Sequence, residues 1–218
     1  MPAIPSPAAE MYTLRLLPLL LVLSLGLTAC GREGAPTSAT DEPQLVLAAE
    51  QGDLALLEQL LIGVPTVDVR DSCAWTPLMK AALNGHLAAA ERLLLAGADT
   101  GLRDKGGYTP LMLAASNNHV EVVRLLLEYG ADPDRREHTR GWTALIWAAK
   151  RGHLDTVQAL LRGGADTRFL DQEHQSALDW AQAQGHRRVA HALQPVSYTH
   201  LTLPTICFKC RSRWSPYH

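Results

Sequence analysis

The chain has 218 residues, of which 47% are hydrophobic and 19% are charged, and its formal net charge is −2. Residues 31–194 contain 16 Lys and Arg against 21 Asp and Glu, so this central part is more acidic, near −5. Because proteins that bind nucleic acid gain affinity from a basic excess that releases counterions from the phosphates, this charge argues against nucleic acid as a partner.

An apolar run near the N-terminus, at residues 14–29, predicts a secretory signal peptide. Its 16 residues include Arg15 and Pro18, and it is shorter than the roughly 20 apolar residues that a membrane-spanning helix needs. A basic residue, an apolar core and small residues before a cleavage point follow one another in such signals. Residues 1–10 are rich in Pro and Ala and end on an acidic residue, which makes Met11 a candidate for the true start.

The end of this run, LTAC at residues 27–30, resembles the lipobox of bacterial lipoprotein signal peptides. The resemblance implies that residues 1–30 form a lipoprotein signal peptide and that Cys30 becomes the lipid-bearing first residue of the mature chain. Acyl chains on Cys30 would bury dozens of methylenes at about 0.8 kcal/mol each, which anchors a protein stably without a membrane span. By the same resemblance, Gly31 rather than Asp after the cysteine favours the outer membrane over retention in the inner membrane, so the expected location is the periplasmic side of a bacterial membrane, the outer one.

Residues 31–43 are small and polar and show no periodicity, which predicts a flexible tether. Such a tether would hold a folded domain away from the lipid. Helical periodicity begins at Gln44.

Two markers repeat along residues 44–194 and indicate successive copies of one structural unit. A Thr or Ser recurs at intervals of 33, 34 and 33 residues, and a His recurs at the same intervals. The markers are Thr76, Thr109, Thr143 and Ser176, and His86, His119, His153 and His186. A weaker leading copy has Asp53 at the histidine position. Two independent markers with one period indicate a solenoid of stacked repeats.

Each unit contains the signals of two short helices. Thr-Pro opens the first helix, where the hydroxyl caps free N–H groups and proline suits the first turn. Paired alanines, such as Ala81 and Ala82, allow neighbouring helices to approach closely. The leucine triplets at 93–95 and 125–127 are expected to form the buried stripe of the second helix. The fourth unit has one extra residue in the segment REHTRGW, so a protruding fingertip is expected there.

These units, for example WTPLMKAALNGHLAAAERLLLAGAD at residues 75–99, resemble ankyrin repeats. The resemblance implies an all-α solenoid of about five helix-turn-helix units with β-turn fingers, stacked on one continuous core. The sequence departs from the family at Lys80, Trp147 and Trp180, where a leucine is typical. Irregular packing is expected at these three positions.

Residues 195–218 break the repeat at Pro195 and contain none of its markers. The segments VSYTH and RSRWSPYH resemble, in order and in one reading frame, translations of the transposon end and adapter used to prepare sequencing libraries. We therefore expect a non-native tail from about Pro195. Cys207 and Cys210 supply only half of a structural zinc site, and no function is expected of them.

The resemblance to ankyrin repeats also implies binding of another protein through the concave face. Partners of the family contact the finger tips and the exposed positions of the first helices. Here these are Trp75, Tyr108 and Trp142 in the fingers, and Leu83, Asn84, Ser116, Asn117, Lys150 and Arg151 on the helices. Aromatic and arginine side chains are frequent anchors of protein interfaces. The three finger aromatics are expected to form a ladder, and the open alternative is that each ring shields its own finger.

No pattern in the sequence predicts catalysis, a cofactor or a metal. The repeated histidines are expected to be structural turn residues that bond nearby backbone. No nucleophile elbow and no Gly-rich phosphate loop occur. The expected function is a lipid-anchored, non-catalytic and monomeric scaffold that binds a protein.

Two alternatives stay open at this stage. Resemblance to periplasmic ankyrin proteins of bacteria suggests support of an oxidative-stress enzyme such as catalase, or immunity to a toxin. A module that binds a small molecule or a metal through His138, His153 or Cys73 is the alternative of a different class. Cys73 would be the only thiol after the lipidated one in the native part, without a partner for an intramolecular disulfide.

Overall fold

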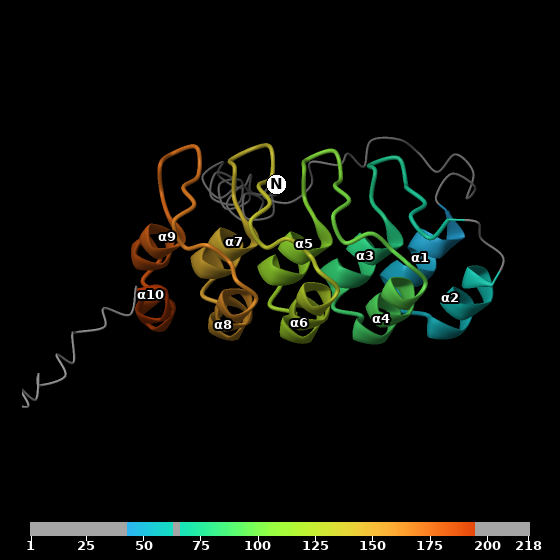
Figure 1. Ribbon diagram of the computed structural model, residues 1–218. Coiled ribbons are helices and arrows are strands. Elements are labelled where there is room, and N and C mark those ends of the chain that lie inside the picture. Colours follow the sequence, from blue (N-terminus) through green and yellow to red (C-terminus); the bar gives the residue numbers. More distant parts are fainter. Residues whose placement is uncertain (1–42, 63–65, 195–218) are drawn as a thin grey trace, which may run out of the picture. The chain divides into compact units, whose positions relative to one another are not determined.

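The structure, a computed structural model, describes residues 43–62 and 66–194 (Figure 1). The predicted signal peptide at 1–30 with its lipidated cysteine, the tether up to residue 42 and the tail at 195–218 lie outside the described residues and stay predictions. In the part that is described, no helix is both long enough and apolar enough to cross a bilayer.

The described residues form five pairs of antiparallel helices. The first helices of the pairs are α1 (Gln44–Gln51), α3 (Pro77–Asn84), α5 (Pro110–Ser116), α7 (Ala144–Arg151) and α9 (Ala177–Ala183). The second helices are α2 (Leu54–Leu61), α4 (Leu87–Leu95), α6 (Val120–Glu128), α8 (Leu154–Arg162) and α10 (Arg187–Leu193). We number the pairs as units one to five along the chain.

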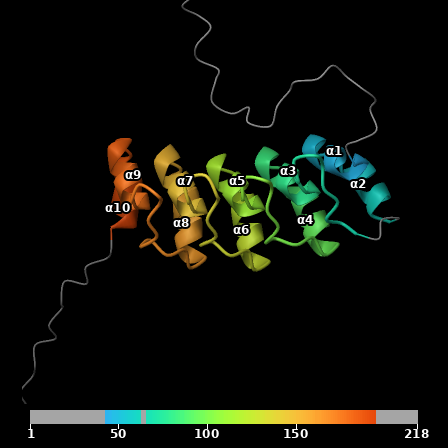
Figure 2. The same ribbon diagram turned by 90° about the horizontal axis from the view of Figure 1, so that it is seen from above.

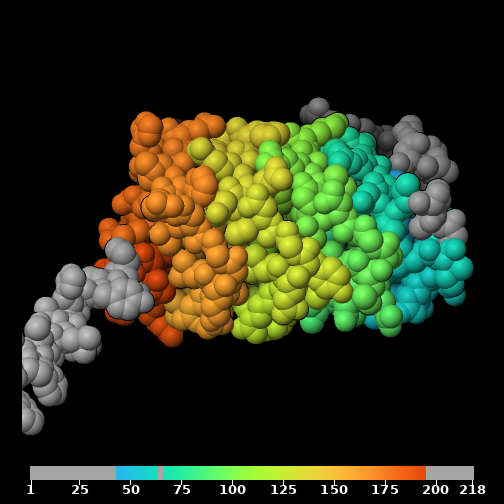
Figure 3. Space-filling view, in the orientation of Figure 1, coloured from blue at the N-terminus to red at the C-terminus, as the bar shows by residue number. Residues whose placement is uncertain are grey.

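The units stack side by side in one direction (Figures 1 and 2). Each first helix packs against the first helix of the next unit, and the second helices form a second row. The loops between units, which we call fingers, project beyond the row of first helices (Figure 1). In the space-filling view the units appear as adjoining bands (Figure 3). The predicted all-α repeat solenoid is confirmed, and the described fingers contain one isolated β-bridge, between Leu170 and Ser176.

In units two to five, the first helix begins directly after the Thr or Ser that marks the repeat in the sequence. The side chains of Thr76, Thr109, Thr143 and Ser176 accept a hydrogen bond from the N–H three residues further on, at 3.2–3.4 Å. Pro77 and Pro110 follow two of these caps and begin α3 and α5. Because such a cap satisfies an N–H without an intrahelical partner, the predicted helix starts are confirmed.

The alanine pairs lie in the centre of the core. Ala81 and Ala82 are fully buried, as are the equivalent pairs of α5 and α7. The leucine triplets correct a prediction, because Leu93 and Leu94 are buried whereas Leu95 is 63% exposed. Successive residues are about 100° apart around a helix, so three in a row cannot share one buried stripe.

Candidate functional site

Each of the four fingers is closed by an acidic side chain that the sequence analysis missed. In the first of them, Asp71 Oδ1 accepts hydrogen bonds from the N–H groups of Cys73 and Trp75, both at 2.8 Å. The equivalent residues of the next fingers are Asp104, Glu137 and Asp171. Their spacing of 33, 33 and 34 residues is the signal by which the sequence could have revealed them.

The finger that leads into unit four contains the extra residue. Its acidic side chain is a glutamate, which is longer than the aspartates of the other fingers. Glu137 accepts hydrogen bonds from the backbone N–H groups of Thr139, Arg140 and Trp142. Burial alone would raise the pKa of Glu137, but the hydrogen bonds from Thr139 and Trp142 outweigh it and the pKa falls below its usual value. The residues at the tip, 138–140, are exposed.

The repeated histidines attach each unit to the unit before it. The Nε2 atoms of His86, His119, His153 and His186 lie 3.0–3.1 Å from the carbonyl oxygens of Glu50, Leu83, Ser116 and Lys150, respectively. The structural role expected of these histidines is thus seen, with the acceptor in the neighbouring unit. Asp53, at the histidine position of unit one, instead caps α2 by accepting from Leu56 N–H at 3.0 Å.

Three of the predicted partner-binding residues also bond to the preceding unit. The pairs are Asn84 with the carbonyl of Glu50 at 2.9 Å, Asn117 with Leu83 at 3.1 Å, and Arg151 with Ser116 at 3.0 Å. Each of these carbonyl groups therefore accepts from two side chains of the next unit. The side chains at these positions line the surface and join units at the same time.

Trp142 belongs to the core, which corrects the prediction that its ring contacts a partner. It is only 2% exposed, and its Nε1 donates a hydrogen bond to the buried carboxylate of Asp171 at 2.9 Å. Its ring packs edge-to-face against Trp147 and Trp180, with centroid distances of 4.6 and 5.3 Å. Trp147 and Trp180 occupy a repeat position at which leucine is typical. Their larger rings pack over Trp142.

The aromatic side chains therefore form a cluster and not the predicted ladder along the fingers. Tyr108, from the finger of unit three, packs against Trp147 with a centroid distance of 6.0 Å. We call Tyr108, Trp142, Trp147 and Trp180 the aromatic cluster. Trp75 is half-buried, and the ammonium group of Lys80 lies 5.3 Å from its ring.

Three cationic side chains lie over the aromatic cluster. Lys150 Nζ is 4.3 Å from the ring centroid of Trp142 and 4.5 Å from that of Trp180. The guanidinium carbon of Arg140 is 4.8 Å from Trp142, and that of Arg151 is 5.5 Å from Trp147. Cations at such distances are attracted to the negative face of an aromatic ring.

The pKa of Lys150 is lower than its usual value. Burial lowers the pKa of Lys150, and the positive charges of Arg140 and Arg151 lower it further, while Glu173 acts in the opposite direction. Within the residues that the structure describes, none of the three cations forms an ion pair with a carboxylate.

The residues of the metal-binding alternative do not converge. His138 is exposed and lies 3.5 Å from a guanidinium nitrogen of Arg103, and His153 bonds to the carbonyl of Ser116. Cys73 is disulfide-bonded, which corrects the expectation for this thiol. Across residues 43–62 and 66–194, no group of three or more His, Cys, Asp and Glu could hold a metal ion.

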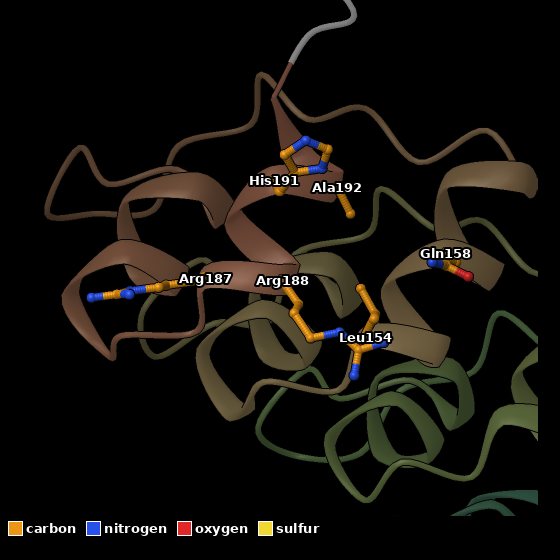
Figure 4. Close-up of a pocket in the computed structure, with 6 residues that line it drawn as sticks. All are labelled: Leu154, Gln158, Arg187, Arg188, His191 and Ala192. Atoms are coloured by element: carbon orange, nitrogen blue, oxygen red, sulfur yellow. The ribbon is translucent and has the colours of Figure 1, made fainter.

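A shallow pocket of about 360 Å³ lies on the row of second helices, away from the fingers (Figure 4). It is lined by Leu154 and Gln158 of α8 and by Arg187, Arg188, His191 and Ala192 of α10. Arg188 reaches toward Leu154, whereas Arg187 extends away (Figure 4). The pocket contains none of the residues proposed for the small-molecule alternative.

The stacked helical pairs define a repeat solenoid. Residues 45–137 and 135–200 match the family described as ankyrin repeats (3 copies). Because this match covers most of the chain, the protein belongs to the ankyrin-repeat family. Members of the family bind protein partners and are generally non-catalytic. No match was found among the curated proteins.

Proposed function

We propose that this protein is a lipid-anchored periplasmic scaffold that binds a partner protein through the surface of its fingers and first helices, without catalysis. We call this the finger–helix surface. It comprises the predicted contacts other than Trp142, namely Trp75, Leu83, Asn84, Tyr108, Ser116, Asn117, Lys150 and Arg151. An accessory role for an oxidative-stress enzyme such as catalase is a finer form of the same proposal.

The observation that supports this surface is a contrast between positions of the repeat. The capping Thr or Ser, the paired alanines and the turn histidine are nearly constant, and each makes a contact that holds the stack together. Near the end of the first helices, one partly exposed position changes from Leu83 to Ser116 to Lys150. A constant frame with a variable, partly exposed row suits recognition of a specific partner.

The partner contact can be tested by photocrosslinking in cells. A photoreactive residue at Asn84 or Arg151, both exposed on first helices, should give a crosslinked product that mass spectrometry can identify. The matched controls are Glu91 and Arg162, which are exposed on second helices. Products at the control positions alone, or at no position, would contradict the proposed surface.

The lipid anchor is tested separately. Radioactive palmitate should label the full chain and should not label a Cys30→Ala variant. Equal labelling of both chains would contradict lipidation at this cysteine, without affecting the proposal for the binding surface.

A further inference from the structure

We propose that units four and five bind an acidic segment of the partner protein, in which carboxylates stand beside apolar side chains. The binding site is a cationic–aromatic patch that consists of Arg140, Lys150 and Arg151 together with the accessible edges of Tyr108, Trp147 and Trp180. This inference rests on the proposed function, because it specifies the chemistry of the partner that the finger–helix surface binds.

The first argument is that three carboxylates of units four and five already accept hydrogen bonds within the fold. Glu137 accepts three backbone N–H groups of its finger, and Asp171 accepts two indole N–H groups and two backbone N–H groups. Asp179 is bound by the backbone N–H and the hydroxyl of Ser176. Glu137 and Asp171 are also buried. These three carboxylates therefore serve the fold, and the exposed Glu173, whose charge acts on Lys150, forms no ion pair with it within the described residues.

The second argument is the contrast with the other end of the same surface. In units one and two, Lys80 Nζ forms an ion pair with Glu50 at 3.1 Å. In unit four the corresponding surface presents Lys150 and Arg151 with no such pair. Unit four therefore presents three cations without an ion-pair partner among the described residues, although the whole chain has a net charge of −2.

The third argument is that the rings hold the cations in place. Lys150 lies between two indole rings, and each arginine lies over one. The cations therefore lose less conformational freedom when a carboxylate binds, which reduces the cost of association. A carboxylate would also relieve the mutual repulsion that helps to lower the pKa of Lys150. The half-buried rings beside the cations suit an apolar side chain next to the carboxylate.

The probe is a fluorescent flexible peptide that contains Glu and Leu in a Gly-Ser background, and its control contains Gln in place of Glu. The full chain should bind the Glu peptide, and the binding should weaken as salt is added. Arg140→Gln combined with Lys150→Gln should weaken binding about fivefold to tenfold. The side chains of these two residues make no hydrogen bond within the described structure, so the variant should keep its helical circular dichroism.

The matched control is Arg162→Gln combined with Arg187→Gln, which removes the same charge from the row of second helices. Equal weakening by this control, or equal binding of the Gln peptide, would overturn the inference. Tighter binding of single-stranded RNA or of phosphatidylglycerol vesicles than of the Glu peptide would also overturn it. If crosslinks at Asn84 and Arg151 persist in the Arg140→Gln, Lys150→Gln variant at the wild-type yield, the acidic partner is wrong and the proposed function stands.

Discussion

Trp142 and Trp147 have the same side chain, but only one of the two ring nitrogens has a partner. Nε1 of Trp142 donates to Asp171, whereas the buried Nε1 of Trp147 has no hydrogen-bond partner within the described structure. A buried donor without an acceptor costs about 1–3 kcal/mol. The contribution of Trp147 therefore comes from its ring, which packs on Trp142 and Tyr108.

Replacing each of these indoles by phenylalanine should separate the two roles. Trp142→Phe removes a hydrogen bond to a carboxylate, so it should lower the free energy of unfolding by about 2 kcal/mol more than Trp147→Phe does. Urea denaturation followed by circular dichroism measures both values. An equal loss in the two variants would show that the bond to Asp171 does not contribute to stability.

At the scale of the helical pair, the turn between the helices is shaped by the next unit. Gly85 has a φ of +75°, and a Cβ at this position would lie 2.4 Å from Nδ1 of His119. Gly185, at the same turn of unit five, also has a φ of +75°, but a Cβ there would meet no described atom within 4 Å. The backbone conformation is the same, and only the neighbouring histidine differs.

Alanine at these two glycines should therefore have unequal effects. Gly185→Ala should cost about 1–2 kcal/mol, because an L residue is strained at positive φ. Gly85→Ala should cost about 1–3 kcal/mol more, because the new methyl group displaces the ring that joins units two and three. The midpoint of urea unfolding reports both. If the two midpoints fall equally, the ring of His119 moves aside at no cost.

The helical elements could be predicted from the sequence because their signals are local. A Thr and a Pro define the start of α3 from adjacent positions, and the histidine markers give the register of the units. The burial of Trp142 could not be predicted in this way, because it depends on Trp147 on the adjoining helix and Trp180 in the next unit. The exposure of Leu95 has a simpler cause, because three consecutive leucines cannot all lie on one face of a helix.

For the proposed binding surface, the sequence could predict which positions are exposed but not what they contact. Positions such as Asn84 and Arg151 follow directly from the repeat register, and both are exposed. Their hydrogen bonds to the preceding unit, and the cations stacked on the aromatic cluster, join residues that are distant in the sequence. Such contacts become visible only when the units are stacked.

At the scale of the whole repeat domain, stability depends on successive interfaces between units. Each of the last four units contributes a histidine to the interface before it, and a second side chain assists in three of them. In a solenoid of this kind the stability is approximately a sum of units and nearest-neighbour interfaces. A change at a central interface should therefore affect the unfolding of the whole domain.

His153 lies at such a central interface, between units three and four, and its lowered pKa predicts that the stability of the domain depends on pH. Burial lowers its pKa, the bond to Ser116 raises it, and the charges of Arg151, His186 and His119 lower it again, so that the net shift is downward from 6.5. The folded state thus binds fewer protons than the unfolded state between the two pKa values. The contribution to stability is complete above about pH 6.5 and is lost as the pH falls through the folded-state pKa.

Urea midpoints between pH 8 and pH 5 should fall with pH, and His153→Gln should flatten that slope. An unchanged slope would assign the pH dependence to other groups.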